Sequence, residues 1–148
     1  MSKNAEVRPV SVTEWPFYWL TRAMVAYSDT VASALRETRL DVPAWRVVMV
    51  LADAEWLSVS EIGELANTKL AAMTKTVKRM KEEDLVETRE GNEDRRVTLV
   101  ALTDQGRLAA EAGMEAAARV ANQAFFQFSP EEQQQLSSML ARVVKNLR

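Results

Sequence analysis

The chain has 148 residues and a formal net charge of −2, and 47% of its residues are hydrophobic and 27% charged. That length fits one domain of ordinary soluble composition. The chain contains no cysteine and no histidine, which excludes disulfides, thiol sensors and the usual metal sites and removes the commonest catalytic groups, so we expect no enzyme, no metal and no cofactor.

The first ten residues are polar, and we expect residues 1–10 to be loosely held. They lack the apolar core of a signal peptide, and no segment approaches the roughly 20 apolar residues that span a bilayer. These features predict a cytoplasmic protein that does not enter a membrane.

A long first helix is predicted from Ser11 to about Arg39. Ser11 and Glu14 have the spacing of a capping box, and Pro16 falls in the first turn, where its missing N–H costs little. Apolar side chains then recur every three or four residues and form one stripe. These are Leu20, Met24, Tyr27, Val31 and Leu35.

A second helix is predicted over residues 44–52, after Asp41 as its N-cap and Pro43 in its first turn. It is apolar nearly all round, so neighbouring elements must cover it on several sides. We therefore expect this helix at the centre of the domain, with Trp45 in the core.

Two short helices joined by a tight turn follow at residues 58–80. Ser58 and Glu61 form a capping box, and Asn67-Thr68 interrupts the helical pattern. The apolar side chains of the first short helix are Ile62, Leu65 and Ala66, and those of the second are Leu70, Met73, Val77 and Met80. This pattern predicts a helix-turn-helix.

The second of these helices is strongly cationic. Residues 69–81 hold five positive charges and no acid, namely Lys69, Lys75, Lys78, Arg79 and Lys81. Standing alone, such a run is more often a solvated face. In an acidic chain, next to a helix-turn-helix, it indicates a nucleic-acid contact.

A β-hairpin is predicted after the cationic helix. Apolar runs at residues 85–89 and 97–102 flank a charged turn that contains Gly91-Asn92. Arg95 and Arg96 lie at its tip and suit the narrow, negative minor groove of DNA. Helix, turn, helix and hairpin is the order of a winged helix-turn-helix in a mostly helical protein.

Two more helices end the chain, the first capped by Thr103 and the second by Ser129, with Pro130 in its first turn. Their apolar stripes exceed what the small winged unit needs for its own core. They could fold back as a monomeric bundle. We favour a two-fold dimer, because exposed stripes of this length would otherwise promote aggregation.

The order of elements and several fragments resemble the multiple-antibiotic-resistance regulator (MarR) family of bacterial transcription factors over nearly the whole chain. The fragments are PAWRV at 43–47, SEI at 60–62, TK at 74–75 with Met80, LV at 85–86, DRR at 94–96, and LT at 102–103 with Gly106. Asp84 stands where the family most often has glycine, which suggests a different turn. Thr88 stands where arginine is common, which removes one phosphate contact.

The resemblance implies one MarR-like domain over residues 1–148, with dimerisation helices at 11–40 and 103–148 and a winged lobe at 41–102. It implies a triangular homodimer that binds a palindromic operator in double-stranded DNA, most simply as a repressor. Lys69, Ala71, Thr74, Lys75 and Lys78 fall where the family meets the major groove. Arg96 matches the wing arginine, and Asp94 the acid that steadies it. From its charge we add Arg79 as a phosphate contact.

Family members are often released from DNA by small aromatic or anionic ligands, which implies a pocket bordered by Trp19, Tyr27, Trp45 and Met49. Plain core packing of these side chains is the competing interpretation. For the chain as a whole, the alternative function is a helical interaction module whose basic helix binds an acidic protein partner.

Overall fold

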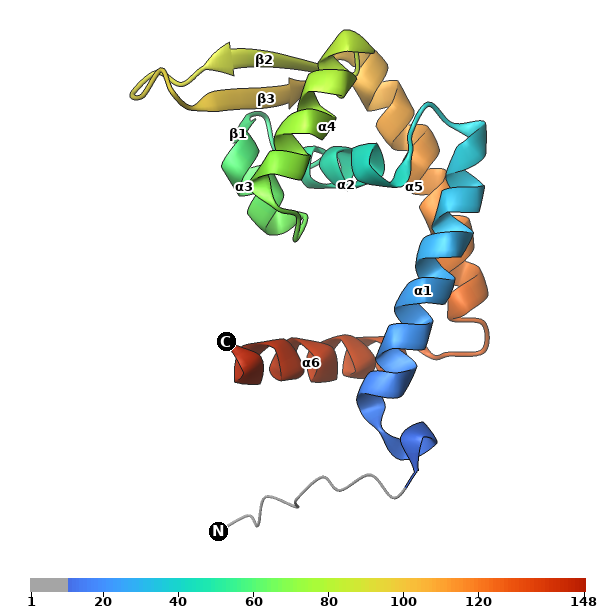
Figure 1. Ribbon diagram of the computed structural model, residues 1–148. Coiled ribbons are helices and arrows are strands. Elements are labelled where there is room, and N and C mark those ends of the chain that lie inside the picture. The colour runs from blue at the N-terminus through green and yellow to red at the C-terminus, as the bar shows by residue number, and fades with distance from the viewer. Residues whose placement is uncertain (1–10) are drawn as a thin grey trace.

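The computed structural model describes residues 11–148, and the expectation for residues 1–10 lies outside them. The helices are α1 (Pro16–Ala34), α2 (Val42–Leu51), α3 (Val59–Leu65), α4 (Leu70–Glu82), α5 (Asp104–Ala124) and α6 (Pro130–Leu147). The strands are β1 (Leu57–Ser58), β2 (Val86–Glu90) and β3 (Thr98–Leu102). The predicted mostly helical fold with a hairpin wing is confirmed, and Figure 1 shows the wing projecting from a lobe of three helices.

The first helix is shorter than predicted at both ends. Ser11 caps only a 3-10 turn, Val12–Glu14, and α1 begins anew at Pro16. Trp15 between them is extended, with φ −83° and ψ 118°, because a residue that precedes proline is disfavoured in the helical conformation. At the other end α1 stops at Ala34, and a 3-10 turn replaces the predicted continuation to Arg39.

Helix α2 lies at the centre of the lobe, as predicted. Its N-cap Asp41 accepts a hydrogen bond from the Ala44 N–H at 2.9 Å. Val47, Val48 and Leu51 are fully buried, and the helix contacts α3, α4, α5 and β3. An apolar helix can be covered on this many sides only in the middle of a domain.

The wing is the larger part of a three-stranded antiparallel sheet with the order β1-β3-β2. Val86 of β2 pairs with Leu102 of β3 at the base, and Glu90 pairs with Thr98 toward the tip. The third strand, β1, pairs with the middle of β3, although the sequence predicted no strand there. Two residues are too few to show the alternation by which a strand is recognised.

Two leucines at the turn of the helix-turn-helix are more exposed than predicted. Leu65 ends α3 and is 67% exposed, and Leu70 begins α4 and is 56% exposed. An apolar stripe on a helix is buried only where a neighbouring element packs against it. At these two helix ends the chain leaves the core, so both side chains lie at the surface.

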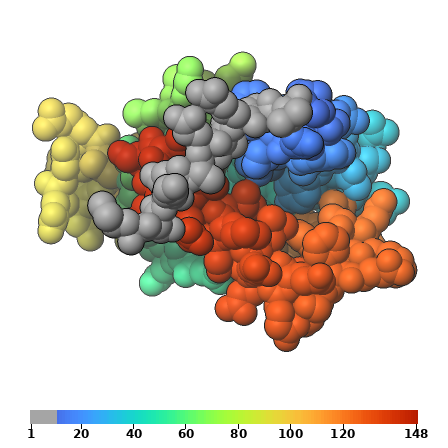
Figure 2. All heavy atoms as spheres, turned by 90° about the horizontal axis from the view of Figure 1, so that it is seen from below, coloured from blue at the N-terminus to red at the C-terminus, as the bar shows by residue number. Residues whose placement is uncertain are grey.

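Helices α1 and α5 pack side by side and extend away from the lobe, and α6 turns back beneath it (Figure 1). Figure 2, seen from below, shows α6 lying across the underside of the molecule. Within the described residues no side chain of α6 is buried, and Met24 and Val25 of α1 are more than half exposed. The folded-back bundle that a monomer would need is therefore not formed. Of residues 11–148, no helix combines the length and the apolar character needed to cross a membrane.

The start of α5 is held against the lobe by a close backbone approach at Gly106. A Cβ at this position would collide with the carbonyl oxygen of Leu85. We expect Gly106→Ala to lower the free energy of unfolding by about 2 kcal/mol, because the backbone itself would have to shift. Urea unfolding measures the effect, with the exposed Glu111→Ala of the same helix as a control that changes stability by less than about 0.5 kcal/mol. An unchanged midpoint for Gly106→Ala would show that α5 can move without cost.

Candidate nucleic-acid interface and ligand cavity

Helix α3 begins with the predicted capping box. The Ser58 hydroxyl accepts from the Glu61 N–H at 3.2 Å, and the Glu61 carboxylate accepts from the Ser58 N–H at 2.7 Å. The hydrogen bonds from the Ser58 hydroxyl and backbone lower the pKa of Glu61 against a small opposing effect of burial. The helix start is therefore fixed by side chains that are only three residues apart.

The turn between α3 and α4 is tight enough to require special conformations. Asn67 adopts a left-handed conformation with φ 49°, which asparagine tolerates better than most residues. The Thr68 N–H donates to the Gly63 carbonyl at 2.8 Å, and a Cβ on Gly63 would approach the Thr68 oxygen to 3.1 Å. This closure sets the direction in which α4 leaves the turn.

Helix α4 divides into an apolar inner face and a cationic outer face. Met73, Val77 and Met80 are buried. The predicted major-groove residues Lys69, Ala71, Thr74, Lys75 and Lys78 are all exposed. No acidic side chain among residues 11–148 lies within ion-pair distance of the three lysines. We call this set the cationic face of α4; its role in binding DNA stays a prediction.

Arg79 is placed differently from these residues. Its Nη2 donates to both carboxylate oxygens of Asp41, at 2.9 and 2.8 Å, and its Nη1 donates to both oxygens of Glu83, at 3.1 and 3.3 Å. Partial burial lowers the pKa of Arg79, but the hydrogen bonds that it donates to Asp41 and Glu83, with the charges of these two carboxylates, outweigh burial and raise the pKa overall. Two acids of the same chain therefore balance the charge of Arg79, and its role as a phosphate contact stays a prediction.

The wing tip is a loop of residues 91–97, closed by a hydrogen bond from the Gly91 N–H to the Val97 carbonyl at 2.8 Å. Asp94 accepts from the backbone N–H of Arg96 at 2.9 Å and from its Nε at 3.3 Å. The side chain of Arg96 is 93% exposed, and Arg95 is exposed beside it. The two arginines thus lie at the tip as expected, and the roles of Asp94 and of both arginines toward DNA stay predictions.

The wing root contains contacts that the sequence did not suggest. The Lys81 Nζ donates to the Thr88 hydroxyl at 2.7 Å, joining the end of α4 to β2. The guanidinium of Arg89 lies 4.1 Å from the centre of the Trp56 ring, a distance at which cation and ring attract each other. Thr88 therefore takes part in holding the wing to α4.

The turn after α4 also departs from its expectation. Asp84 adopts the left-handed conformation, with φ 59°, that glycine would adopt at lower cost. The Leu85 N–H donates to the Met80 carbonyl at 2.9 Å, which closes the end of the helix. The expectation of a different turn is wrong, because aspartate takes the conformation that favours glycine.

A cavity of about 280 Å³ lies between α1, α2 and the turn that precedes α4. Tyr27, Trp45 and Met49 line it as predicted. Trp19 does not; it lies at the start of α1, where its indole N–H donates to the Thr13 carbonyl at 2.7 Å. The other lining residues are Met24, Ser28, Val31, Val42, Arg46, Val50, Leu65, Ala66 and Asn67. The prediction for Trp19 is wrong because two helical turns separate it from Tyr27.

The chemistry of the cavity is mostly apolar, with a few polar groups. The residues with polar side chains among those that line it are Arg46 on α2, Asn67 in the turn before α4, and Tyr27 and Ser28 on α1. Apolar walls with a few polar groups are typical of sites for small organic ligands. Sequence reasoning missed Arg46, although it directly follows Trp45 in the PAWRV fragment.

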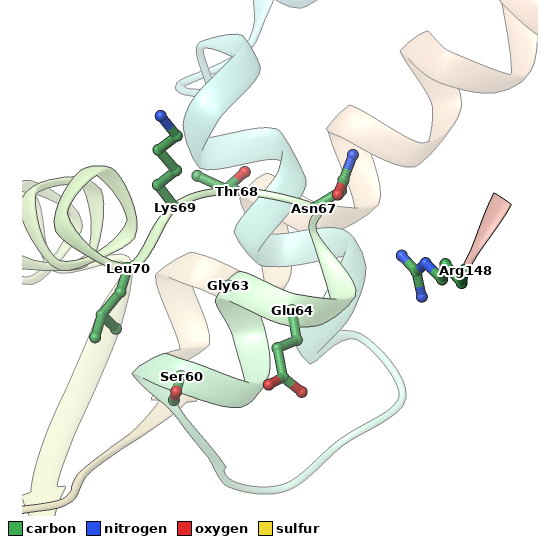
Figure 3. Close-up of a pocket in the computed structure, with 8 residues that line it drawn as sticks. All are labelled: Ser60, Gly63, Glu64, Asn67, Thr68, Lys69, Leu70 and Arg148. Atoms are coloured by element: carbon green, nitrogen blue, oxygen red, sulfur yellow. The ribbon is translucent and has the colours of Figure 1, made fainter. Parts of the chain in front are cut away.

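A wider hollow of about 750 Å³ lies on the other side of the helix-turn-helix, and Figure 3 shows Arg148 at the end of α6 facing it. Its lining is mainly polar and contains no aromatic side chain; besides Arg148 it comprises Ser60, Gly63, Glu64, Asn67, Thr68, Lys69 and Leu70. It is the gap between α6 and the lobe. No group of three or more acidic side chains in residues 11–148 is arranged to hold a metal ion.

Comparison with known proteins identifies the family. The model of the MarR family matches residues 40–97. The HTH-type transcriptional repressor IacR of Pseudomonas putida is 38% identical over 134 residues, which cover 90% of this chain and 80% of IacR. The chain belongs to the MarR family. As a member of it, this chain is a DNA-binding transcription regulator and not an enzyme, and the interaction-module alternative is set aside.

Solved structures show the same fold. A probable transcriptional regulator from Pseudomonas aeruginosa is 25% identical, with a TM-score of 0.78, and the match covers 90% of this chain and 99% of that one. The repressor CouR, solved bound to a 23-mer DNA duplex, is 19% identical, with a TM-score of 0.82, and the match covers 95% of this chain and 99% of CouR. CouR from Rhodococcus jostii RHA1 has also been solved bound to p-coumaroyl-CoA. These likenesses confirm the winged helix-turn-helix fold of this MarR-family regulator.

The capping box of α3 makes stability depend on pH. Because the pKa of Glu61 is lowered in the folded protein, its contribution is fully present above the ordinary pKa of glutamate and is lost as the pH falls through the lowered value. We expect Ser58→Ala to lower the free energy of unfolding by about 1 kcal/mol at pH 7. We also expect the difference between the parent and Glu61→Gln to shrink on acidification. Urea unfolding at several pH values measures both, with exposed Ser60→Ala as a near-neutral control; a difference that grows toward low pH contradicts the assignment.

Proposed function

We propose that this MarR-family regulator is a repressor that binds a palindromic operator as a homodimer, through the cationic face of α4 and the wing. The main support is that Lys69, Lys75 and Lys78 are exposed on an otherwise acidic chain and have no acidic partner within the described residues. The relatives IacR and CouR are both named as repressors, and CouR has been solved on a DNA duplex.

The cationic face divides into two parts along α4. Lys69, Ala71 and Thr74 are near the helix start, where they can reach base edges in the major groove. The Thr74 hydroxyl donates to the Leu70 carbonyl at 2.9 Å, which leaves its oxygen free to accept a hydrogen bond from a base. Lys75 and Lys78 lie further along the helix and neutralise phosphates. Phosphate contacts fix the register of the protein, whereas contacts to bases select the sequence.

The wing supplies the second contact. Arg96 extends from the tip, and its Nε hydrogen bond to Asp94 orients a side chain that is 93% exposed. An arginine held in this way can enter a narrow minor groove, where the negative potential is strongest over A·T-rich sequence. Arg95 beside it contributes charge toward the backbone.

The dimer is formed by the helices that leave apolar side chains uncovered. Met139, Val144 and Leu147 of α6 and Met24 and Val25 of α1 are each at least 48% exposed, and a second copy covers them. A two-fold axis then presents two α4 helices about 34 Å apart, one turn of DNA. Because the regulator must share a compartment with the DNA, we assign it to the cytoplasm.

The cavity is the proposed site for a small aromatic or anionic effector. Tyr27, Trp45 and Met49 offer an apolar slot, and Arg46 offers the charge that pairs with an anionic group. Asn67 also lines the cavity and forms the left-handed turn that leads into α4. A ligand that contacts Asn67 can therefore bias the direction of α4, which accounts for release from DNA. CouR has been solved with an aromatic acyl-CoA.

The DNA assignment predicts a change in salt dependence. We expect Lys75→Ala and Arg96→Ala each to weaken binding to a duplex that the parent has selected from a random library. Each should also reduce the slope of log affinity against log salt by about one unit, because one fewer counterion is released. Fluorescence anisotropy at four salt concentrations measures both. Arg119→Ala on α5 removes the same charge away from the lobe and should change neither; equal slopes for all four proteins would refute the interface.

The effector assignment predicts a spectroscopic response. Titration with a panel of aromatic carboxylates should change the intrinsic tryptophan fluorescence, through Trp45 in the cavity, and lower the affinity for DNA. We expect Ser28→Leu, which fills part of the cavity of about 280 Å³, to abolish both effects while leaving DNA binding in the absence of ligand intact. A full response from Ser28→Leu would assign the ligand to another site.

A further inference from the structure

Arg79 is on the recognition helix α4, but its guanidinium hydrogen-bonds to other residues of the same chain. It holds two carboxylates that come from different parts of the fold. Asp41 belongs to the segment between α1 and α2, and Glu83 follows the last residue of α4. The hydrogen bonds measure 2.8 to 3.3 Å, with Nη2 on both oxygens of Asp41 and Nη1 on both oxygens of Glu83. The planar fork of arginine lets one side chain hold two carboxylates in fixed positions.

Asp41 is the structural anchor of this contact. Its Oδ1 also caps α2 by accepting from the Ala44 N–H at 2.9 Å. One carboxylate therefore ties Arg79 to the first turn of the central helix. Val42, the next residue, and Trp45 one turn later both line the cavity.

A second arginine reinforces the same junction. The Nη2 of Arg39 donates to the Glu83 carbonyl at 2.8 Å, and its Nη1 lies 3.4 Å from the side-chain oxygen of Gln105 on α5. The end of α4 is thus fixed to the α1–α2 segment and to the start of α5. We call Arg79, Asp41, Glu83 and Arg39 the α4 clamp.

The α4 clamp is unsuited to a role in stability alone. The side chains of Arg79 and Asp41 are 37% and 53% exposed, and ion pairs at such exposed sites add little to the free energy of unfolding. A rigid guanidinium that holds two carboxylates through its two Nη atoms instead restricts orientation. Since the cationic face is useful only when α4 meets the groove at the right angle, orientation is what the clamp can supply.

We propose that Arg79 is a positioning residue for DNA binding, which holds α4 at the angle that the operator requires by gripping Asp41, without touching DNA itself. This inference rests on the proposed function and assigns a role to a cation that the DNA interface does not use. It also assigns a role to the acidic residue Asp41. The proposal predicts that Asp41 favours DNA binding, whereas charge alone predicts that an acid near the interface opposes it.

The decisive variant is Asp41→Asn. Asparagine caps a helix as well as aspartate does, so α2 keeps its N-cap, but the ionic grip on Arg79 is lost. If only charge mattered, removing an acid near the interface would tighten binding to DNA. The α4 clamp instead predicts affinity about tenfold weaker, within the usual range of coupling between sites, with an unchanged salt slope because no phosphate contact is lost.

Arg79→Lys tests the other partner. Lysine keeps the positive charge but cannot hold both carboxylates with one rigid fork. We expect a similar loss of affinity, again without a change in salt slope. The double variant should bind no more weakly than the weaker single variant, because both changes break the same contact. Glu82→Gln is the matched control, since it removes an exposed acid at the same end of α4 and should leave binding equal or slightly tighter.

Binding is measured by anisotropy on the duplex selected by the parent, at four salt concentrations and well below the melting temperature of every variant. Asp41→Asn that binds as tightly as the parent, or more tightly, overturns the proposal. A salt slope reduced by about one unit for Arg79→Gln, which removes the charge that Arg79→Lys keeps, would do so too, because it would show a phosphate contact. Lower melting temperatures with unchanged affinity would reduce the α4 clamp to a stabilising contact and also overturn it. The DNA assignment is tested separately by the parent and Lys75→Ala; it can hold while the α4 clamp fails.

Discussion

The structure depends on the burial of α2, an apolar helix with little polar surface of its own. Val47, Val48 and Leu51 are completely removed from solvent, and burial of one such side chain is worth roughly 2 kcal/mol. Helices α3, α4 and α5 and the strand β3 all contact α2, so their relative positions are set by the surface of one element. Asp41, which caps the start of α2, is also the residue that holds Arg79 in the α4 clamp. Trp45 of the same helix lines the cavity.

The positive charges of α4 are concentrated on its outward side, although the chain as a whole is acidic. The net charge is −2, yet the outward side of α4 presents Lys69, Lys75 and Lys78 with no acidic partner among residues 11–148. The cation at the end of the same helix, Arg79, is balanced by two carboxylates. One helix therefore combines charges that no acid of residues 11–148 balances, which suit a polyanion whose binding weakens with salt, with a fixed charge that joins it to the rest of the lobe.

The uncovered side chains of α1 and α6 and the cavity beside α2 are features of the same arrangement. Helix α1 contributes Tyr27 and Ser28 to the cavity and also exposes Met24 and Val25, so the helix that we assign to the dimer also borders the proposed effector site. Asn67 connects that site to the turn before α4. The proposed effector site, the proposed dimer surface and the recognition helix are thus connected through about one helical turn of α1 and one tight turn.

The sequence by itself determined the features that rest on contacts within about four residues. The capping box at Ser58, the caps at Asp41 and Ser129 and the lysines on one side of α4 could be read from spacing alone, because helix caps and faces are local. Only the tertiary structure decided the partner of Arg79, which is 38 residues away, the exclusion of Trp19 from the cavity and the pairing of the two-residue strand β1. These outcomes depend on how separate elements pack against one another. The sequence shows that a side chain is charged, but only the packing decides whether that charge lies beside a carboxylate or in solvent.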